Sequence, residues 1–454
     1  MPKPRTIISL FSGALGLDLG LARAGFSLRA VAECDEGALE SIDLNLKRVS
    51  HRPVVRVSEK LTEGNVAQVC QEIVRRARLK VGAVGVLAGA PPCQPFSTAG
   101  RRLSLKDERA SGFDIMFRAI ELLRPRYFVI ENVRGVMSAA LKHRPLIDRG
   151  TGSPPLKPSE EHGSAFRRIL RQLTELCGAT GYCATWGVLN AADFGVAQKR
   201  ERLVIIGTSD GKSIWPEPTH SDRGRVGLHP WANLRSALVG LAENDSRYLA
   251  FNENTRQYLR LIPQGGNWRS LPARVQERAI GGAYHSWGGR SGFLRRLTWN
   301  EPSPTVTNNP RGRATMLCHP TKARPLSIRE CARIQGFPDD WEFSGSITEQ
   351  YRQIGNATPV GLGEAIGRAI AEAMRDPRLP RFHGEVLCSD VGLLQRLSTG
   401  PRTTLSPGSA RPTADRLADG IWLGKPNRGR GGFANLKARP ALLADSDDRV
   451  SFDA

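Results

Sequence analysis

The chain has 454 residues, of which 40% are hydrophobic and 24% are charged, which is enough for two folded units and a tail. Its formal net charge of +21 makes a polyanion the expected partner, and nucleic acid is the commonest one. The 8 cysteines include no C-x-x-C pair, which argues against a zinc site or a disulfide framework. The sequence shows no signal peptide and no apolar run that could cross a bilayer, so we expect a cytoplasmic protein without a metal site.

The first elements predict a strand, a glycine turn, a helix and a second strand. The strands are expected over Thr6 to Phe11 and Ser27 to Ala32, with the helix between Leu17 and Ala24. The turn is Ser12-Gly13-Ala14-Leu15-Gly16, and Glu33 follows the second strand. This order is typical of dinucleotide binding, where an acid at this distance binds ribose hydroxyls. The spacing is not G-x-G-x-x-G, so a plain structural turn fits this stretch equally well.

A short apolar strand is predicted over Val84 to Ala88, and it ends in Gly-Ala-Pro-Pro-Cys. Pro91 and Pro92 fix their own backbone φ angles, so the turn after the strand is stiff. The turn places Cys93 at the carboxyl end of a parallel strand, where open α/β sheets bind their ligands. A buried structural cysteine is the alternative, but the two prolines and the following Gln94 favour a reactive thiol.

Two more groups of polar residues adjoin predicted strands. The strand over Tyr127 to Ile130 ends at Glu131, whose carboxyl we expect to be partly withdrawn from water. The stretch Gln198-Lys199-Arg200-Glu201-Arg202 leads into another apolar strand. Because alternate residues of a strand share a face, Arg200 and Arg202 are predicted to point together and to clamp an anion or a carbonyl. A solvated strand edge is the alternative.

Further helices are indicated by apolar periodicity and by end signals: Val66 to Ala77, Phe113 to Leu123, Ser164 to Cys177 capped by Gly178, Ser327 to Ile334, and Thr358-Pro359 to about Met374. The last of these helices is rich in small residues, which predicts close packing against a neighbour. The stretch from Thr98 to Gly112 is basic and polar, which predicts a loop that could close over a polyanion; an ordinary solvated connection is the alternative.

Periodicity fades from about Thr208, where glycine, tryptophan and arginine mix. We expect a second, loop-rich and partly β unit over residues 208–350. Arginines among aromatic residues suit nucleic-acid contact, although the tryptophans fit a core equally well. Residues 376–454 are rich in Pro, Ser, Thr, Arg and Gly, and they are predicted to form a largely disordered tail.

Taken in order, these motifs resemble those of the cytosine-5 DNA methyltransferases over about residues 6 to 375. The matching segments are FSGALGLDLG from Phe11, Glu33-Cys34-Asp35, GAPPCQPFS around Cys93, Glu131-Asn132-Val133, Gln198 to Arg202, RPLSIRECARIQGFPDDW from Arg324, and Tyr351 to Asn356. Three positions depart from the family pattern: Leu15 replaces a glycine, Asn65 stands where an aspartate usually contacts the adenine, and Ala197 replaces a proline.

The resemblance implies an α/β fold: a Rossmann-like sheet of S-adenosylmethionine-dependent methyltransferases with a second, smaller, loop-rich or β target-recognition domain. Residues 1–207 and 351–375 would form the catalytic, cofactor-binding domain, and residues 208–350 the target-recognition domain. Residues 376–454 remain as the tail.

The resemblance also implies the chemistry. A methyl group would pass from S-adenosylmethionine to carbon 5 of a cytosine flipped out of a specific duplex sequence, through a covalent bond between Cys93 and carbon 6. Glu131 would act as the acid near ring nitrogen 3, and Arg202 would hold the base carbonyl with support from Arg200. The implied cofactor-binding residues are Phe11, Ser12, Gly13, Leu15, Gly16, Glu33, Asn65, Pro92 and Asn356.

The expected partner is double-stranded DNA, bound by a monomer in the bacterial cytoplasm. The enzyme would be the modification half of a restriction–modification system, whose endonuclease acts on the same sequence without direct contact. Two alternatives stay open: an RNA (tRNA) cytosine-5 methyltransferase and a non-catalytic DNA-binding relative. A nicotinamide dehydrogenase, suggested by the first turn alone, leaves Cys93 unexplained.

Overall fold

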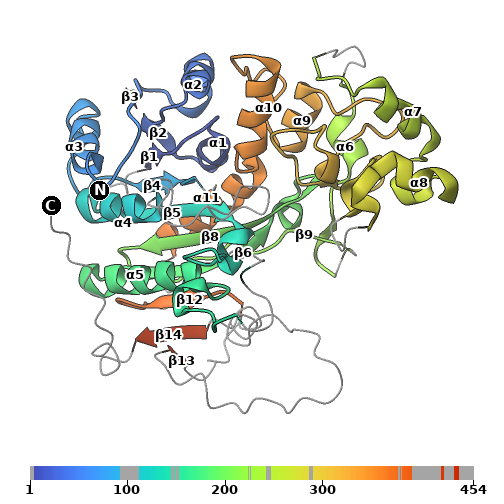
Figure 1. The fold of residues 1–454 in the computed structure, drawn as a ribbon. Coiled ribbons are helices and arrows are strands. Elements are labelled where there is room, and N and C mark those ends of the chain that lie inside the picture. Colours follow the sequence, from blue (N-terminus) through green and yellow to red (C-terminus); the bar gives the residue numbers. More distant parts are fainter. Residues whose placement is uncertain are drawn as a thin grey trace.

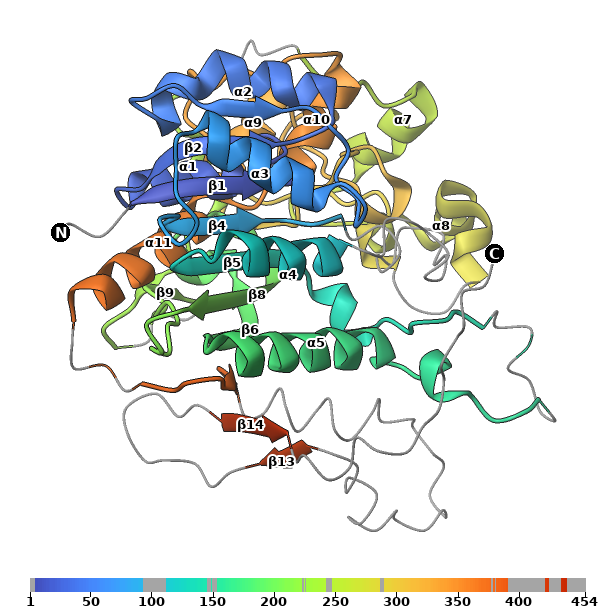
Figure 2. The ribbon, with the colours of Figure 1, turned by 90° about the vertical axis from the view of Figure 1, so that its left-hand side faces the viewer.

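The computed structural model describes residues 5–92, 112–144, 148, 153–222, 224, 226–241, 247–285, 290–376, 379, 381–390, 421–423 and 434–438. A 10-stranded sheet runs through the molecule in the order β13-β14-β12-β6-β8-β5-β4-β1-β2-β3 (Figures 1 and 2). Its strands are β1 (Thr6–Leu10), β2 (Ser27–Ala32), β3 (Val55–Val57), β4 (Val86–Gly89), β5 (Tyr127–Val133), β6 (Cys183–Asn190), β8 (Glu201–Thr208), β12 (Val386–Cys388), β13 (Ile421–Leu423) and β14 (Ala434–Ala438).

Helices cover both faces of this sheet. One face packs against α1 (Gly16–Arg23), α2 (Glu36–Val49) and α11 (Val360–Arg375), and the other against α3 (Val66–Arg76), α4 (Gly112–Leu123) and α5 (Ser164–Thr180). Each face of the sheet therefore has its own hydrophobic core. Adjacent residues of β1 point to opposite faces, so Ile7 lies in the core under α1, α2 and α11, and Ile8 lies in the core under α3, α4 and α5. Because these strands are buried on both faces, their sequences are continuous apolar runs and do not alternate between apolar and polar residues.

The remaining elements are short. Among the described residues they are α6 (Leu234–Leu238), α7 (Glu253–Leu261), α8 (Ala273–Ile280), α9 (Ile328–Ile334), α10 (Ile347–Asn356), the two-residue strands β7 (Gln198–Lys199), β9 (His220–Ser221), β10 (His229–Pro230) and β11 (Ser303–Pro304), and 3-10 turns at Arg134–Ser138, Pro158–Glu160, Ala191–Phe194, Trp268–Ser270, Gly281–His285, Arg290–Gly292 and Arg313–Thr315. In the part of the chain that the structure describes, no helix is long and apolar enough to span a membrane.

One strand runs against the others in the centre of the sheet. Strands β1, β2, β4 and β5 run parallel to one another, whereas β8 is antiparallel to both β5 and β6. The carboxyl ends of β1, β2, β4 and β5 therefore share one edge with the amino end of β8. The register sets Val133 opposite Arg202, so the last residues of β5 face the first residues of β8.

The predicted strands and helices are present with small shifts of their ends, and β2 has the expected bounds. Helix α5 is longer than predicted: it continues to Thr180, and Gly181 ends it with a φ of 79°. Gly178 therefore lies inside the helix and is not its cap, because the left-handed conformation that ends the helix comes three residues later.

The region over residues 208–350 contains more helix than the sequence indicated, and its described strands are only two residues long. A small separate core forms there around Tyr258, Leu259, Trp268 and Met316. Helix α9 instead packs in the main cluster, together with Leu234 of α6. Trp268 is buried within the small core, so for this residue the core alternative is the right one.

Three short strands lie within residues 376–454, which were expected to be largely disordered. Strand β12 pairs in parallel with β6, and all three of its residues are buried. Strand β14 pairs antiparallel with β12, and β13 with β14. The apolar triplet Val386-Leu387-Cys388 explains the first of these strands, because it covers an edge that β6 would otherwise expose.

Glycines allow α1 and α11 to approach closely. A Cβ added at Gly20 of α1 would lie 2.5 Å from Glu364 N and still closer to Val360 O. On the facing helix, a Cβ at Gly363 would lie 2.7 Å from Leu17 O. This confirms the close packing expected from the small residues of α11, and it fixes the turn that precedes α1.

We expect Gly20→Ala to lower the free energy of unfolding by about 1–3 kcal/mol, because backbone atoms of α11 leave no room for a methyl group. Urea unfolding followed by circular dichroism measures the change. Gly178→Ala is the matched control: nothing lies within 4 Å of a Cβ added there, and alanine in a helix interior should raise the stability by about 0.5–1 kcal/mol. Equal effects of the two variants would contradict the packing argument.

Candidate active site and cofactor site

The candidate active site lies at the sheet edge where β4 and β5 end. Beyond Gly89, the chain continues through the Pro91-Pro92 turn, whose first proline is buried and whose second is half-buried. Cys93 and the basic loop expected over Thr98 to Gly112 lie outside the described residues, apart from Gly112 at the start of α4. The position of the thiol therefore stays a prediction, and the turn that leads to it can be analysed.

The proline turn is held from two sides. Asn132, which is buried near the end of β5, donates from Nδ2 to Pro91 O at 3.0 Å and accepts from Val133 N at 2.9 Å. On the opposite side, a Cβ added at Gly112 would lie 2.7 Å from Pro91 Cβ, so the first residue of α4 packs on the proline ring. Asn132 follows Glu131 in the sequence, and no local pattern there indicates this contact. Its contact makes it a positioning residue for the chain entering Cys93.

Glu131 and Arg202 form a buried ion pair across β5 and β8. Arg202 Nε lies 2.8 Å from Glu131 Oε1, and the side chains are 10% and 6% exposed. The antiparallel register brings the two residues together although they are far apart in sequence. Two buried charges favour each other only with good geometry, and removing either partner leaves the other uncompensated. The carboxyl expected to be withdrawn from water is buried, as predicted, and its neighbour is the predicted arginine.

Arg200 has other partners than Arg202. It is 2% exposed, and its guanidinium donates to Val306 O at 2.8 Å, Gly355 O at 2.8 Å and Ala357 O at 3.0 Å. These partners of Arg200 are thus backbone carbonyls, and a clamp formed together with Arg202 stays a prediction. The rule that alternate residues share a face holds only within one strand. Arg200 lies between β7 and β8 and belongs to neither, so the rule does not relate it to Arg202. Through these hydrogen bonds, Arg200 connects the start of β8 with the segments around Val306 and Gly355.

Two buried glutamines make further hydrogen bonds between the same segments. Gln198 donates from Nε2 to Gln335 Oε1 at 2.7 Å and accepts from Val306 N at 2.8 Å. Gln335 in turn donates to Ile354 O at 2.6 Å and Ala357 O at 3.1 Å. Both side chains are fully buried. We call Gln198, Arg200 and Gln335 the buried polar network. Sequence reasoning did not find Gln335, because a buried glutamine has no signature apart from its partners.

The candidate cofactor site lies at the neighbouring ends of β1 and β2. The half-buried carboxylate of Glu33 accepts from Gly13 N at 2.7 Å, from Cys34 N at 2.9 Å and from Asp35 N at 3.0 Å. It therefore ties the turn after β1 to the loop after β2. Gly13 has a φ of 50°, and nothing lies within 4 Å of a Cβ added there, so the space over this turn is open. Phe11 and Ser12 precede it, and each is half-buried.

Leu15 and Gly16 shape the turn from inside. Leu15 is fully buried in the main core and has a φ of 62°, a left-handed conformation that costs a non-glycine residue roughly 1–2 kcal/mol. Burial of its side chain offsets that cost. A Cβ added at Gly16 would overlap Thr358 O, so this glycine serves the contact with the segment before α11. Any contact of these two residues with a ligand would come from their backbone.

The other predicted cofactor residues have different surroundings. The side-chain amide of Asn65 accepts from Thr62 N at 2.8 Å and donates to Lys60 O at 2.9 Å, so both of its ends are bonded within its own loop. Asn356 is exposed at the end of α10, immediately after the carbonyl of Gly355 that Arg200 binds. The structure thus assigns Asn65 a role in the loop, and its contact with an adenine stays a prediction.

The described cysteines do not resemble a nucleophile. Burial raises the pKa of Cys70, Cys177, Cys183 and Cys388 to about 12 and that of Cys318 to about 11. Cys331 is buried, and Cys34 is exposed with a pKa raised by desolvation and by nearby carboxylates. A raised pKa lowers the thiolate fraction at neutral pH. Within the described residues, no group of three or more His, Cys, Asp or Glu side chains could hold a metal ion.

Comparisons with known proteins agree with this arrangement. The family model of C-5 cytosine-specific DNA methylases matches residues 5–372. The type II methyltransferase M.Sau96I of Staphylococcus aureus is 34% identical over 368 residues, covering 81% of this chain and 76% of that protein. M.PspPI of a Psychrobacter species is 35% identical over 369 residues, covering 80% and 78%. A solved structure described as a DNA modification methyltransferase encoded within a prophage (E. coli) superposes with a TM-score of 0.51 at 21% identity, covering 82% of this chain and 99% of that one.

The sheet with helices on both faces defines an α/β fold, which this solved structure shares. The chain belongs to the C-5 cytosine-specific DNA methylase family, and the protein is a DNA (cytosine-5) methyltransferase.

We expect Asn132→Ala to leave Pro91 O without its buried donor and to loosen the turn before Cys93. Loss of such a hydrogen bond costs about 1–3 kcal/mol of stability, and the chemical step should slow because the thiol is held less firmly. Single-turnover methyl transfer separates this step from substrate binding. Ser138→Ala, which removes an exposed hydroxyl bonded to Gly135 O in the turn after β5, is the control. A single-turnover rate unchanged in Asn132→Ala would show that the contact does not position the turn.

Proposed function

We propose that this enzyme methylates carbon 5 of one cytosine, flipped out of a specific duplex DNA sequence, with S-adenosylmethionine as the methyl donor. The observation that carries this proposal is the buried pair of Glu131 and Arg202, which lies beside the turn leading to Cys93. A carboxyl and a guanidinium at the end of two adjacent strands supply the polar groups that the edge of a flat pyrimidine requires.

The residue types fit the chemistry. Carbon 5 of cytosine is a weak nucleophile, and addition of a thiolate to carbon 6 turns the ring into an enamine with electron density at carbon 5. Cysteine suits this step because sulfur is strongly nucleophilic even at a small thiolate fraction. Glu131 is proposed to share a proton with ring nitrogen 3 as the adduct forms, and Arg202 to hold the base carbonyl. Once carbon 5 has taken up the methyl group, a base removes the proton from that carbon. The electrons of the broken C–H bond re-form the double bond between carbons 5 and 6 as the thiolate leaves carbon 6.

S-adenosylmethionine supplies an electrophilic methyl group when bound. The residues over the first turn fit it: the carboxylate of Glu33 is suited to ribose hydroxyls, the space above Gly13 is open, and Phe11 offers an aromatic ring to a sulfonium. Ser12, Leu15, Gly16, Pro92 and Asn356 would line the same site. Asn65 is the least supported member, because its amide is bonded within its own loop.

Double-stranded DNA is the proposed substrate, and base flipping is required because a stacked cytosine cannot enter a closed site. The net charge of +21 supports a polyanionic partner. The relatives are named type II methyltransferases, which supports a role as the modification enzyme of a restriction–modification system in the cytoplasm. We propose a monomer, with a catalytic domain over residues 1–207 and 351–375 and target recognition within residues 208–350.

The covalent mechanism is tested with duplex DNA in which 5-fluorocytosine replaces the target cytosine. The fluorine cannot leave as a proton does, so the wild type should form a stable protein–DNA adduct, seen as a shifted band after denaturation. Cys93→Ala should form none, and Cys34→Ala, which changes an exposed thiol, should form as much as the wild type. An adduct with Cys93→Ala would refute the assignment, and preferential methylation of tRNA would favour the RNA alternative.

We expect Glu33→Ala to weaken the binding of S-adenosylmethionine by roughly 10- to 100-fold, because hydrogen bonds to a charged group contribute about 1.5–3 kcal/mol. Isothermal titration calorimetry measures the affinity. Glu36→Ala is the matched control, since this exposed acid lies one turn further along at the start of α2. Affinities that fall equally in both variants would assign the effect to charge alone and not to the contact.

A further inference from the structure

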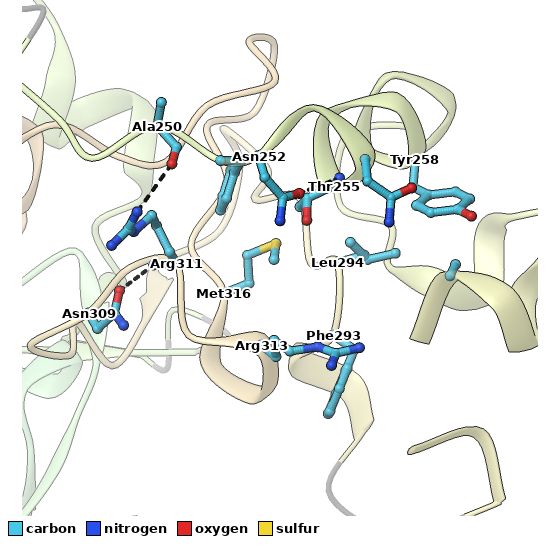
Figure 3. A pocket seen from close by; sticks show the side chains of 13 residues that line it. Ala250, Asn252, Thr255, Tyr258, Phe293, Leu294, Asn309, Arg311, Arg313 and Met316 are labelled. Carbon is cyan, nitrogen blue, oxygen red and sulfur yellow. Dashed lines mark hydrogen bonds between the residues drawn. The ribbon is translucent and has the colours of Figure 1, made fainter. Parts of the chain in front are cut away.

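A cavity of about 480 Å³ lies in the small core region, and neither Glu131 nor Arg202 lines it (Figure 3). Its wall comes from α7 and the residues just before it, from Phe293 and Leu294, and from the segment 309–316. The buried side chains of Phe251, Tyr258, Leu294 and Met316 give it an apolar floor. The proposed methyl transfer does not use this cavity.

The rim of the cavity is polar and cationic. Asn252, Asn309, Arg311 and Arg313 all line it and are exposed. Among the lining residues that the structure describes, none is acidic. Glu253, which lies next to Asn252 in sequence, instead forms ion pairs with Arg256 and Arg260 along α7. The cavity is therefore suited to a ligand that offers hydrogen-bond acceptors.

Arg311 and Arg313 keep most of their donors available. In the described part of the chain, Arg311 makes one long side-chain bond, from Nη1 to Ala250 O at 3.4 Å (Figure 3). Arg313 donates from Nη2 to Ile280 O at 3.1 Å, and its guanidinium lies 5.8 Å from the centre of the Phe293 ring. Within the described residues neither arginine forms an ion pair. By contrast, Arg296 is buried on the carbonyls of His319 and Pro320, and Arg324 is paired with Glu330.

The loop that carries these two arginines is anchored to the active site. Strand β11 pairs with β7, directly before Arg200, and Ser303 N donates to Ala197 O at 2.8 Å. Arg200 then binds Val306 O, and a Cβ added at Gly355 would overlap the backbone of Asn308. Only a few residues separate this fixed segment from Arg311. The rim therefore has a defined position relative to the Glu131–Arg202 pair, as a sequence-reading surface requires.

We propose that the rim of this cavity is a base-reading surface, from which Arg311 and Arg313 contact guanine in the major groove of the target DNA. The inference rests on the proposed function, and it names residues that determine sequence specificity. A guanidinium binds O6 and N7 of guanine with two parallel hydrogen bonds, the commonest specific contact to DNA. The contact of Arg313 with Phe293 holds its guanidinium plane in place, and the asparagines of the rim supply amides for a neighbouring base pair.

The test is a selection of bound duplexes from a randomised pool with the full-length protein, followed by sequencing. The wild type should enrich a site that contains G·C pairs. Arg311→Ala and Arg313→Ala should each lower the preference for one such pair by roughly 5- to 100-fold, and Arg→Lys at the same positions should restore charge without restoring the preference. Arg260→Ala is the matched control, because this arginine of α7 is paired with Glu253 and does not line the cavity.

The outcomes separate this inference from the proposed function. An enriched site that is unchanged in both variants, or a loss of binding that is equal for all sequences and is rescued by lysine, overturns the inference and leaves methyl transfer intact. A wild type that enriches no sequence also overturns it. If the wild type enriches a site but does not methylate a cytosine in it, the proposed function fails and the base-reading role stands. Thermal unfolding of each variant shows whether the small core is preserved.

Discussion

The reversed direction of β8 is the constraint on which the candidate site depends. In an all-parallel sheet the amino end of this strand would lie at the far edge, and Arg202 would be a strand length away from Glu131. Because β8 is antiparallel to β5, the end of one strand faces the start of the other, and the guanidinium meets the carboxylate at 2.8 Å. Because the pair is buried, loss of either partner would leave the other charge uncompensated.

The buried polar network connects this edge to the rest of the molecule. Arg200 binds carbonyls from two distant segments, and Gln335 binds the end of α10. Most of these bonds end on buried backbone carbonyls, and removing the donor to Val306 O or Gly355 O would leave that carbonyl without this hydrogen bond. The start of β8, the segment around Val306 and the segment before α11 are thereby held as one unit. Residues that touch no substrate thus fix where substrate contacts lie.

Much of the fold follows from the sequence for a simple reason. Strands buried on both faces appear as short apolar runs ended by glycine or proline, and the predictions for β2 and for the turn after β4 rest on these local signals. Cys93 and Glu131 were indicated in the same way, by polar residues placed directly after such runs. The hydrogen bonds of Arg200 could not be predicted, because its partners, Val306 and Gly355, are more than 100 residues away in the chain and have no local trace. The extension of the sheet by β12 was missed for a similar reason, since three apolar residues give no period.

The charge of the chain also shows what composition leaves open. A net charge of +21 indicates a polyanion, but it does not say which arginines meet it. Several of them serve the protein itself: Arg200 and Arg296 bind buried carbonyls, and Arg324 neutralises Glu330. A buried guanidinium with five donors is an efficient way to satisfy loop carbonyls in a region with little regular structure. Within the described residues, arginines such as Arg311 and Arg313 form no ion pair, and their positions matter more than the net charge.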